Sequence, residues 1–497
     1  MAAQRGSWHA RSAAARAGAA LLAAVAVALV VLVALGAAAQ PARAAVAKGI
    51  VDNRLEYPGG IALAPVEGYA EEMGPLELGA TWTRVLVYWD QLQPVAPWDA
   101  GYQGFDPTYR NELDTVVRAL CGQGINVILT ATDPPDWARD AKYEKYWAAY
   151  PTTAAVRTGD PRVRSAFRGF AWYLARHFGS LGVDHFEVWN EPNLRIRPQI
   201  VGKKVVGPEV YRRMLIAFSQ GAHAANPSAV VIAGATSRFG SNGTSAGSTS
   251  PQWFARYLKE HGAAKWFDAY SHHPYTTRGS DPRPSAPPIS PRNQVTLGNL
   301  TVLLKLFPSK PFYLTEFCYS TGQKDAFVVV VSPTEQASYL RQAFALLDAP
   351  AYKQVKVLLW FLVRDWQAHP DTDPELGVFS GLEDVNGVRK PAWYAFAGHN
   401  KLTVTAPAAA ASGAPFDVGG TLTTRVGQGA DVQVLLQTRS VDGGSWRTIG
   451  QQTTDDTGAY QFASVTQTAA ARYRVVWDGV CESGQATVGL AGQGGTE

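Results

Sequence analysis

Short apolar runs alternate with longer amphipathic segments along the chain from about residue 45 to residue 400. Each apolar run is six to eight residues long and is bounded by Gly, Pro or polar residues, as in buried strands. The predicted strands are residues 46–52, 82–89, 125–130, 183–190, 230–235, 267–272, 311–316 and 355–362.

The segments between these runs have the spacing of helices. In 108–122, Leu113, Val116, Val117 and Leu120 recur at positions that share one helical face. Further helices are predicted at 163–178, 208–225, 251–264, 293–307 and 334–347. Strands that alternate with helices in this way predict a (β/α)8 TIM barrel over residues 45–400. The competing fold, an open doubly wound sheet, would normally carry a Gly-rich phosphate loop after the first strand, and the sequence has none there.

The pattern changes after residue 400. Residues 401–415 are rich in Ala and Pro and predict a linker. From 416 to 497, short runs with strand-like alternation, such as Val432, Val434 and Leu436, are separated by Asp-Gly and Gly-Gly turn signals. This pattern predicts a small, Ig-like antiparallel β-sandwich as an accessory domain.

The N-terminal 44 residues have the organisation of a targeting segment. Arg5, Arg11 and Arg16 precede an uncharged apolar run at 17–39, and Ala-Arg-Ala at 42–44 is a small-x-small cleavage site. We therefore predict a signal peptide, with an uncleaved membrane anchor as the alternative. Both export the remaining chain, so we expect a secreted or extracellular-surface protein that contacts a membrane only if this segment is retained.

Charge and cysteine content narrow the possible partners. Four arginines before residue 45 account for the whole formal net charge of +4. No basic cluster remains that would indicate nucleic-acid binding. Cys121, Cys318 and Cys481 are far apart and form no CxxC motif, so they predict neither a metal site nor a disulfide framework, although one pair could form.

Two carboxylates occupy the ends of predicted strands. Glu191 ends the fourth strand, where Pro192 interrupts the apolar run, and Glu316 ends the seventh. Because all strands of a TIM barrel point the same way, both side chains are expected on the same rim, where ligands bind. Two opposed carboxylates suit acetal hydrolysis, since one donates a proton to the leaving oxygen and the other attacks the anomeric carbon.

The residues around Glu191 also carry a family resemblance. Phe-Glu-Val-Trp-Asn-Glu-Pro-Asn at 186–193 resembles the strand-4 signature of clan A glycoside hydrolases, and is most similar to that of family 39 and its relatives. The resemblance covers about residues 48–400. It implies a retaining enzyme in which Glu191 is the general acid/base and Glu316 is the nucleophile.

The resemblance implies further site residues. Asn190 would bind the sugar 2-hydroxyl, and His273 and Tyr275 would lie beside the nucleophile. Trp360, or else Trp366, would supply an aromatic face under the sugar.

Strand alternation raises two questions about neighbouring residues. His272 and His273 must point to opposite faces, so only one can reach the groove, and the family pattern selects His273. Arg84 matches a strand-2 arginine that supports the nucleophile. However, Glu187 shares the face of Glu191 and needs a partner inside the barrel, and Arg84 could be that partner instead.

Trp137 is the best aromatic candidate in the loops after the second and third strands, because two prolines precede it closely. It could stack on a sugar ring or pack the loops themselves.

The sequence thus predicts an exported retaining glycosidase that cleaves a β-glycosidic bond of an oligo- or polysaccharide and requires no metal or organic cofactor. A transglycosylase that uses the same site is one alternative, and a non-catalytic carbohydrate-binding surface protein is another.

Overall fold

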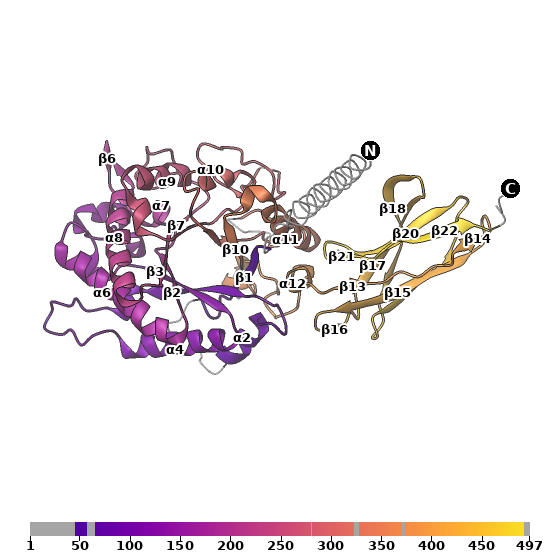
Figure 1. The fold of residues 1–497 in the computed structure, drawn as a ribbon, viewed down its shortest axis with the longest axis horizontal. Coiled ribbons are helices and arrows are strands. Elements are labelled where there is room, and N and C mark those ends of the chain that lie inside the picture. Colours follow the sequence, from indigo (N-terminus) through magenta and orange to yellow (C-terminus); the bar gives the residue numbers. More distant parts are fainter. Residues whose placement is uncertain (1–44, 57–64, 280, 323–327, 370–372, 492–497) are drawn as a thin grey trace, which may run out of the picture. The chain divides into compact units, whose positions relative to one another are not determined.

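The computed structural model describes residues 45–56, 65–279, 281–322, 328–369 and 373–491. Its central feature is a closed barrel of parallel strands, which Figure 1 shows surrounded by helices. The barrel order is β1-β10-β9-β8-β7-β4-β3-β2. This confirms the predicted TIM barrel, and the open-sheet alternative is wrong. The strands are β1 (Ala47–Val51), β2 (Trp82–Tyr88), β3 (Asn126–Thr132), β4 (His185–Val188), β7 (Val230–Thr236), β8 (Ala269–His272), β9 (Phe312–Phe317) and β10 (Val355–Phe361).

Four of the α-helices begin where the sequence provides a side-chain cap. Side chains of Asp106, Asp160, Ser250 and Ser332 each accept a hydrogen bond from a first-turn N–H, and a proline follows each of them. These residues start α4 (Pro107–Gly122), α6 (Pro161–His177), α9 (Pro251–Glu260) and α11 (Pro333–Leu347). The barrel region also contains α2 (Val66–Met73), α3 (Trp89–Leu92), α5 (Glu144–Trp147), α7 (Pro192–Arg195), α8 (Gly207–Ala225), α10 (Thr301–Leu304) and α12 (Pro391–Ala397).

The predicted helix at 293–307 is wrong in length. The structure has only a 3-10 turn, Leu297–Asn299, followed by the single turn of α10. A capping box between Thr296 and Asn299 starts helical structure late. Gly298 lies so close to the carbonyl of Ala286 that a side chain would clash, which favours close loop packing over a longer helix here.

The barrel interior separates into an apolar base and a polar upper part. An apolar cluster inside the barrel consists of Val51, Ile128, Ile232, Ala269, Tyr313, Val357 and Leu359. Further along the strands the interior side chains become polar, and Arg84, Glu187 and Thr315 are all buried. The change from apolar to polar along β2 and β9 directs the chemistry to the carboxyl ends of these strands.

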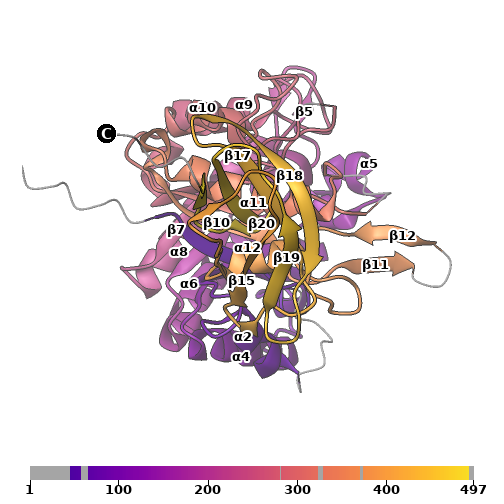
Figure 2. The same ribbon diagram turned by 90° about the vertical axis from the view of Figure 1, so that its right-hand side faces the viewer.

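Two small sheets lie outside the barrel strands. After β10, the chain forms a hairpin of β11 (Trp366–His369) and β12 (Asp373–Val378), which Figure 2 shows as a ribbon extending from its neighbours. A second short hairpin pairs β5 (Ile200–Val201) with β6 (Lys204–Val205).

The C-terminal region forms the predicted sandwich. One sheet joins β13, β15, β16 and β19, and the other joins β14, β22, β20, β17 and β18, with β21 paired to β20. Alternate residues Val434, Leu436, Tyr473 and Val475 are buried between them, as the sequence pattern indicates. The bounds are β13 (Lys401–Leu402), β14 (Ala409–Ala410), β15 (Phe416–Thr424), β16 (Gly427–Gln428), β17 (Gln433–Ser440), β18 (Gly443–Thr453), β19 (Ala459–Val465), β20 (Ala471–Trp477), β21 (Cys481–Glu482) and β22 (Ala486–Leu490).

Residues 401–415, predicted as a linker, contribute β13 and β14 to these sheets. All three cysteines are free thiols. The predicted signal peptide or anchor, 1–44, lies outside the described residues, and within the described part of the chain no helix has the length and apolarity to span a membrane.

Candidate active site

Glu191 is presented by a sharp turn that follows β4. Its backbone is left-handed, with φ 45° and ψ 52°, and Trp189 also has a positive φ of 72°. The amide of Glu191 donates to the carbonyl of Ala235, 2.9 Å away, and its own carbonyl accepts from the amides of Leu194 and Arg195. A left-handed non-glycine residue costs roughly 1–3 kcal/mol, so these bonds must hold the turn. The turn lifts the carboxyl group onto the rim of the barrel, where its side chain is 22% exposed.

Glu316 ends the opposite strand, β9, and is held by donors on two sides. Arg84 Nη2 lies 2.6 Å from Oε1, and the Tyr275 hydroxyl donates to Oε2 across 2.6 Å. Burial alone would raise the pKa of Glu316, but His273, Arg84 and the Tyr275 hydrogen bond outweigh it and lower the pKa to about 2. Glu316 is therefore a carboxylate at any ordinary pH.

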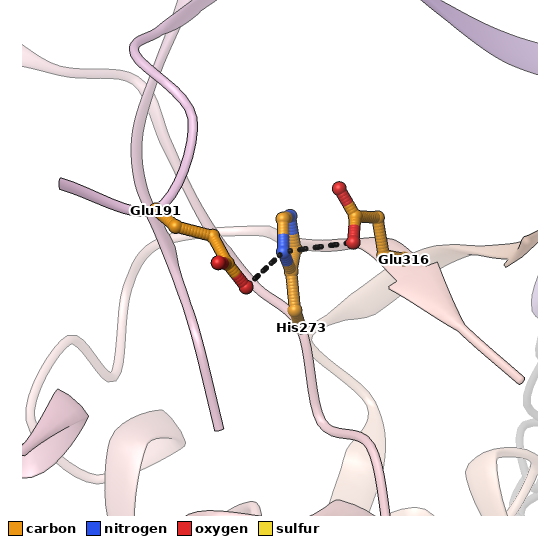
Figure 3. A group of neighbouring side chains, drawn as sticks. All are labelled: Glu191, His273 and Glu316. Atoms are coloured by element: carbon orange, nitrogen blue, oxygen red, sulfur yellow. Dashed lines mark hydrogen bonds and ion pairs between the residues drawn. The ribbon is translucent and has the colours of Figure 1, made fainter. Parts of the chain in front are cut away.

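His273 lies between the two carboxyl groups, as Figure 3 shows. Its Nδ1 is 3.3 Å from Glu191 Oε1 and 3.3 Å from Glu316 Oε2. One carboxyl oxygen of Glu191 and one of Glu316 also lie within 4.8 Å of each other. Retaining glycosidases have carboxyl groups roughly 5–5.5 Å apart, whereas inverting enzymes leave roughly 6.5–9.5 Å for a water molecule. The geometry matches the retaining class.

Arg84 pairs with Glu316, which answers the question raised by the sequence. The guanidinium also makes a buried ion pair with Glu56, a residue of the loop after β1 that the sequence reasoning missed. Glu187 instead accepts hydrogen bonds from the hydroxyls of Thr130, at 2.8 Å, and Thr315, at 2.9 Å. The one sequence signal for Glu56 as a site residue is its position shortly after the first strand, at the carboxyl end of the barrel.

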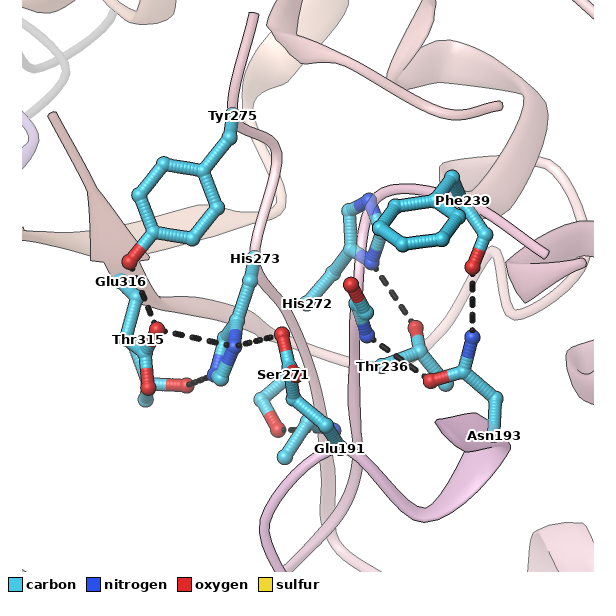
Figure 4. A network of polar contacts seen from close by, with 12 residues as sticks. Glu191, Asn193, Thr236, Phe239, Ser271, His272, His273, Tyr275, Thr315 and Glu316 are labelled. Carbon is cyan, nitrogen blue, oxygen red and sulfur yellow. Dashed lines mark hydrogen bonds and ion pairs between the residues drawn. The ribbon is translucent and has the colours of Figure 1, made fainter. Parts of the chain in front are cut away.

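The two histidines divide as alternation predicts. His272 turns away from the pair, with Nδ1 2.8 Å from the Thr236 hydroxyl and Nε2 2.9 Å from the Val295 carbonyl. Burial lowers its pKa to about 3, so it is a neutral structural histidine. Figure 4 shows the two rings in separate hydrogen-bond groups, with only His273 directed at Glu191 and Glu316.

The two asparagines of the strand-4 motif have different environments. Asn193 is fully buried and ties together neighbouring loops, because it donates to the carbonyls of Phe239 and Thr249 and accepts from the Ser237 amide. By contrast, Asn190 Oδ1 is buried and has no hydrogen-bond partner among the described residues. A buried acceptor of this kind is suited to a substrate hydroxyl.

The placement of Trp360 is a correction to the sequence reasoning. Its ring is completely buried outside the barrel, beside Phe317, and its indole N–H donates to the Ser380 carbonyl across 2.9 Å. Alternation along β10 turns the next residue, Phe361, to the interior instead. Phe361 and Trp366, which is 52% exposed, line a cavity of about 400 Å³ together with Asn53, Leu362 and Val378.

Trp137 packs within its own loop region. Its ring meets Trp89 and Trp98 edge to face, with centroids 5.2 Å apart in both pairs, and its N–H donates to the Gln93 carbonyl. It remains partly exposed. These contacts match the loop-packing alternative.

Glu191, His273 and Glu316 are close enough together to surround a cation. The Arg84 guanidinium already neutralises Glu316, however, and a second cation beside it would be repelled. We therefore assign no metal to this group.

Comparison with known proteins assigns the chain to a family. Residues 77–330, just over half of the chain, match the model of Cellulase (glycosyl hydrolase family 5). The matched region contains Arg84, Glu191, His273 and Glu316. The chain therefore belongs to glycosyl hydrolase family 5. This is a clan A family, so the resemblance to clan A is confirmed, whereas the narrower resemblance to family 39 is not. A search of curated proteins finds no significant match.

A search of solved structures returns several distant matches. A β-glucuronidase of Parabacteroides merdae shares 11% identity with a TM-score of 0.44, over 89% of this chain and 48% of that protein. A GH5_18 protein of Bifidobacterium longum subsp. infantis shares 14% identity with a TM-score of 0.49, over 71% and 78%. A hyperthermophilic β-glucosidase from Pyrococcus furiosus shares 15% identity with a TM-score of 0.44, over 67% and 83%. The chain spans about half the length of the β-glucuronidase, and we transfer no substrate from any of the three.

Proposed function

We propose that this protein is a retaining glycoside hydrolase that cleaves a β-glycosidic bond through a covalent glycosyl-enzyme intermediate. The observation that carries the proposal is the separation of Glu191 and Glu316, with carboxyl oxygens within 4.8 Å of each other at one rim of the barrel. That spacing leaves no room for a water molecule between a catalytic base and the sugar, so direct attack by a carboxylate is favoured.

In the first step, Glu316 is the nucleophile. Arg84 and Tyr275 hold it ionised and fix both of its oxygens, which directs a carboxylate lone pair at the anomeric carbon. Glu191, the more exposed of the two, donates a proton to the leaving oxygen. The bond from the anomeric carbon to the leaving oxygen breaks as its bond to Glu316 forms.

In the second step, Glu191 is ionised and acts as a general base. It removes a proton from a water molecule that attacks the anomeric carbon, and the ester bond to Glu316 breaks. Asn190 binds the sugar 2-hydroxyl in this proposal, which is supported by its buried side-chain oxygen without a partner among the described residues. The Phe361 and Trp366 rings offer apolar surface to a sugar face.

The substrate class is an oligo- or polysaccharide with a β-linkage, and we propose that the enzyme acts outside the cell. Export is supported by the sequence of residues 1–44.

The test is a set of three single substitutions assayed on aryl β-glycosides. We expect Glu316→Ala to abolish turnover. Glu191→Ala should cost about 10²–10⁴-fold with poor leaving groups and far less with activated ones, because an activated leaving group needs no proton. The exposed Glu144 offers a matched control, and Glu144→Ala should behave as the parent.

The stereochemistry of the product separates mechanisms. NMR of the first-formed sugar should show the anomer of the substrate, and an inverted product would exclude the proposed mechanism. A glycoside formed with an added sugar acceptor, in place of the free sugar, would assign the same site to transglycosylation.

A further inference from the structure

A buried chain of hydrogen bonds runs behind the catalytic pair. Glu187, on β4, accepts from the Thr130 and Thr315 hydroxyls, and the Thr315 oxygen lies 3.1 Å from His273 Nε2. All four side chains are fully buried. Figure 4 shows the end of this chain, where Thr315 contacts His273 and His273 reaches Glu191 and Glu316.

The hydroxyl hydrogen of Thr315 is donated to Glu187 and is not available to His273. A threonine hydroxyl has one hydrogen and two lone pairs, and an ionised carboxylate can only accept. Since Thr315 donates its hydrogen to Glu187, its oxygen presents a lone pair to His273. The contact at Nε2 is therefore favourable only if Nε2 carries a hydrogen.

The other ring nitrogen needs a hydrogen for the same reason. Nδ1 lies 3.3 Å from an oxygen of Glu191 and 3.3 Å from an oxygen of Glu316, and the ionised Glu316 can only accept. An imidazole with a hydrogen on each nitrogen is an imidazolium, with one positive charge.

Among the residues that the structure describes, Arg84 is the one competitor for Nε2. Its Nη1 lies 3.4 Å from Nε2, farther than the Thr315 oxygen at 3.1 Å, and arginine can only donate. If Nε2 accepted a hydrogen bond from Arg84, it would carry a lone pair and no hydrogen. That lone pair would then face a lone pair of the Thr315 oxygen at 3.1 Å, which is repulsive. Among the ionisable groups around the ring, Glu316 and Glu191 favour its positive charge and Arg84 opposes it. The others are Glu187 behind Thr315, Tyr275 and the neutral His272.

We propose that Glu187 is a positioning residue which, through the Thr315 hydroxyl, holds His273 as an imidazolium between Glu191 and Glu316. The role in catalysis rests on the function proposed above. The pKa of His273 is in accord: burial would lower it, but the attraction of Glu316 and Glu191 raises it overall.

This charge suits the first chemical step. Before the step, the negative charge of the pair is on Glu316 and Glu191 is protonated. Afterwards Glu316 is a neutral ester and the charge is on Glu191, because its proton has left with the aglycone. Nδ1 is equally distant from both oxygens, so its N–H can interact with whichever carboxylate is negative without movement of the ring.

The test combines a ring-protonation measurement with a pH–rate profile. ¹⁵N NMR of histidine-labelled protein reports both ring nitrogens, and the spectrum of His273→Asn identifies the His273 signals. We expect an imidazolium in the parent at pH 7. Thr315→Val removes the acceptor of the Nε2–H, and loss of one hydrogen bond to a charged group should lower the midpoint of His273 by about one pH unit. Glu187→Gln keeps an acceptor for Thr315 but removes the negative charge behind it, which should lower the midpoint as well, by about the same amount.

The raised pKa of His273 determines the direction in which activity depends on pH. The imidazolium is present at low pH and is lost as pH rises, so the basic limb of kcat should move down by about one unit in both variants, with KM changed less than about twofold. Thr315→Ser keeps the hydroxyl and should restore the parent profile. Thr130→Val removes the other hydroxyl from Glu187 but leaves Thr315 in place, so its His273 midpoint should match the parent.

Three results would overturn the proposal: a neutral His273 in the parent at pH 7, an unchanged midpoint in Thr315→Val or Glu187→Gln, or an equal shift in Thr130→Val. If either valine variant fails to fold, Glu187→Gln and Thr315→Ser decide the question. The NMR measurement needs no substrate. Activity retained by Glu316→Ala would therefore refute the proposed function without affecting the protonation result.

Discussion

Removal of one hydroxyl group, in Tyr275→Phe, tests whether hydrogen bonding keeps Glu316 ionised. The hydroxyl donates to Glu316 Oε2 across 2.6 Å in a buried site. A hydrogen bond to a charged group contributes about 1.5–3 kcal/mol, and one pKa unit corresponds to about 1.4 kcal/mol. Arg84 and His273 remain, so the pKa of Glu316 should rise from about 2 to roughly 3–4, still below its usual value.

The consequence is a shift of the acidic limb of activity. Because the pKa of Glu316 is depressed, its reactive form is present at neutral pH and is lost only as pH falls through the pKa. For a variant with a pKa near 3.5, about a quarter of the molecules carry an ionised Glu316 at pH 3, against about nine-tenths in the parent. The expected deficit from ionisation is therefore about fourfold at pH 3 and negligible at pH 7.

The assay should isolate attack by Glu316. A 2-deoxy-2-fluoro glycoside with a good leaving group traps the covalent intermediate, and the rate of inactivation between pH 2.5 and pH 6 follows ionisation of the nucleophile. Tyr319→Phe is the matched control, because its buried hydroxyl contacts Pro282 and Thr276 and not Glu316. If the acidic limb of Tyr275→Phe coincides with that of the parent, the tyrosine does not stabilise the carboxylate.

Three more substitutions separate binding from stability. Trp366→Ala should raise KM with little change in kcat, as measured by steady-state kinetics, because its exposed ring borders the cavity after β10; an unchanged KM would remove it from the site. Trp360→Ala should lower the free energy of unfolding by about 3–5 kcal/mol in urea titrations, and a KM change alone would contradict its burial. Arg84→Met removes the buried Arg84–Glu56 ion pair and should destabilise by about 3–5 kcal/mol; adding Glu56→Gln should recover part of this, and no recovery would refute the pairing.

The sequence was sufficient to predict the barrel strands, most of the helices and the two carboxylates of the candidate site, Glu191 and Glu316. Each barrel strand is a local apolar run, and α4, α6, α9 and α11 carry their own caps, so neighbouring residues contain the signal. Glu191 and Glu316 were found for the same reason, because each follows directly at the end of such a run. The length of the helix predicted at 293–307 was overestimated, since it depends on the approach of Gly298 to the carbonyl of Ala286 in the preceding loop.

The tertiary structure decided which side chains meet. Trp360 and Phe361 are adjacent, and the register of β10 in the barrel determined that Phe361, and not Trp360, points inward. Arg84 could have paired with Glu187, but the loop after β1 brings Glu56 to it, and Glu187 is left to two threonines. These choices depend on the stagger between strands that are up to 232 residues apart, as for Arg84 and Glu316. A strand's own pattern specifies that a side chain faces inward, while only closure of the barrel determines its neighbours there.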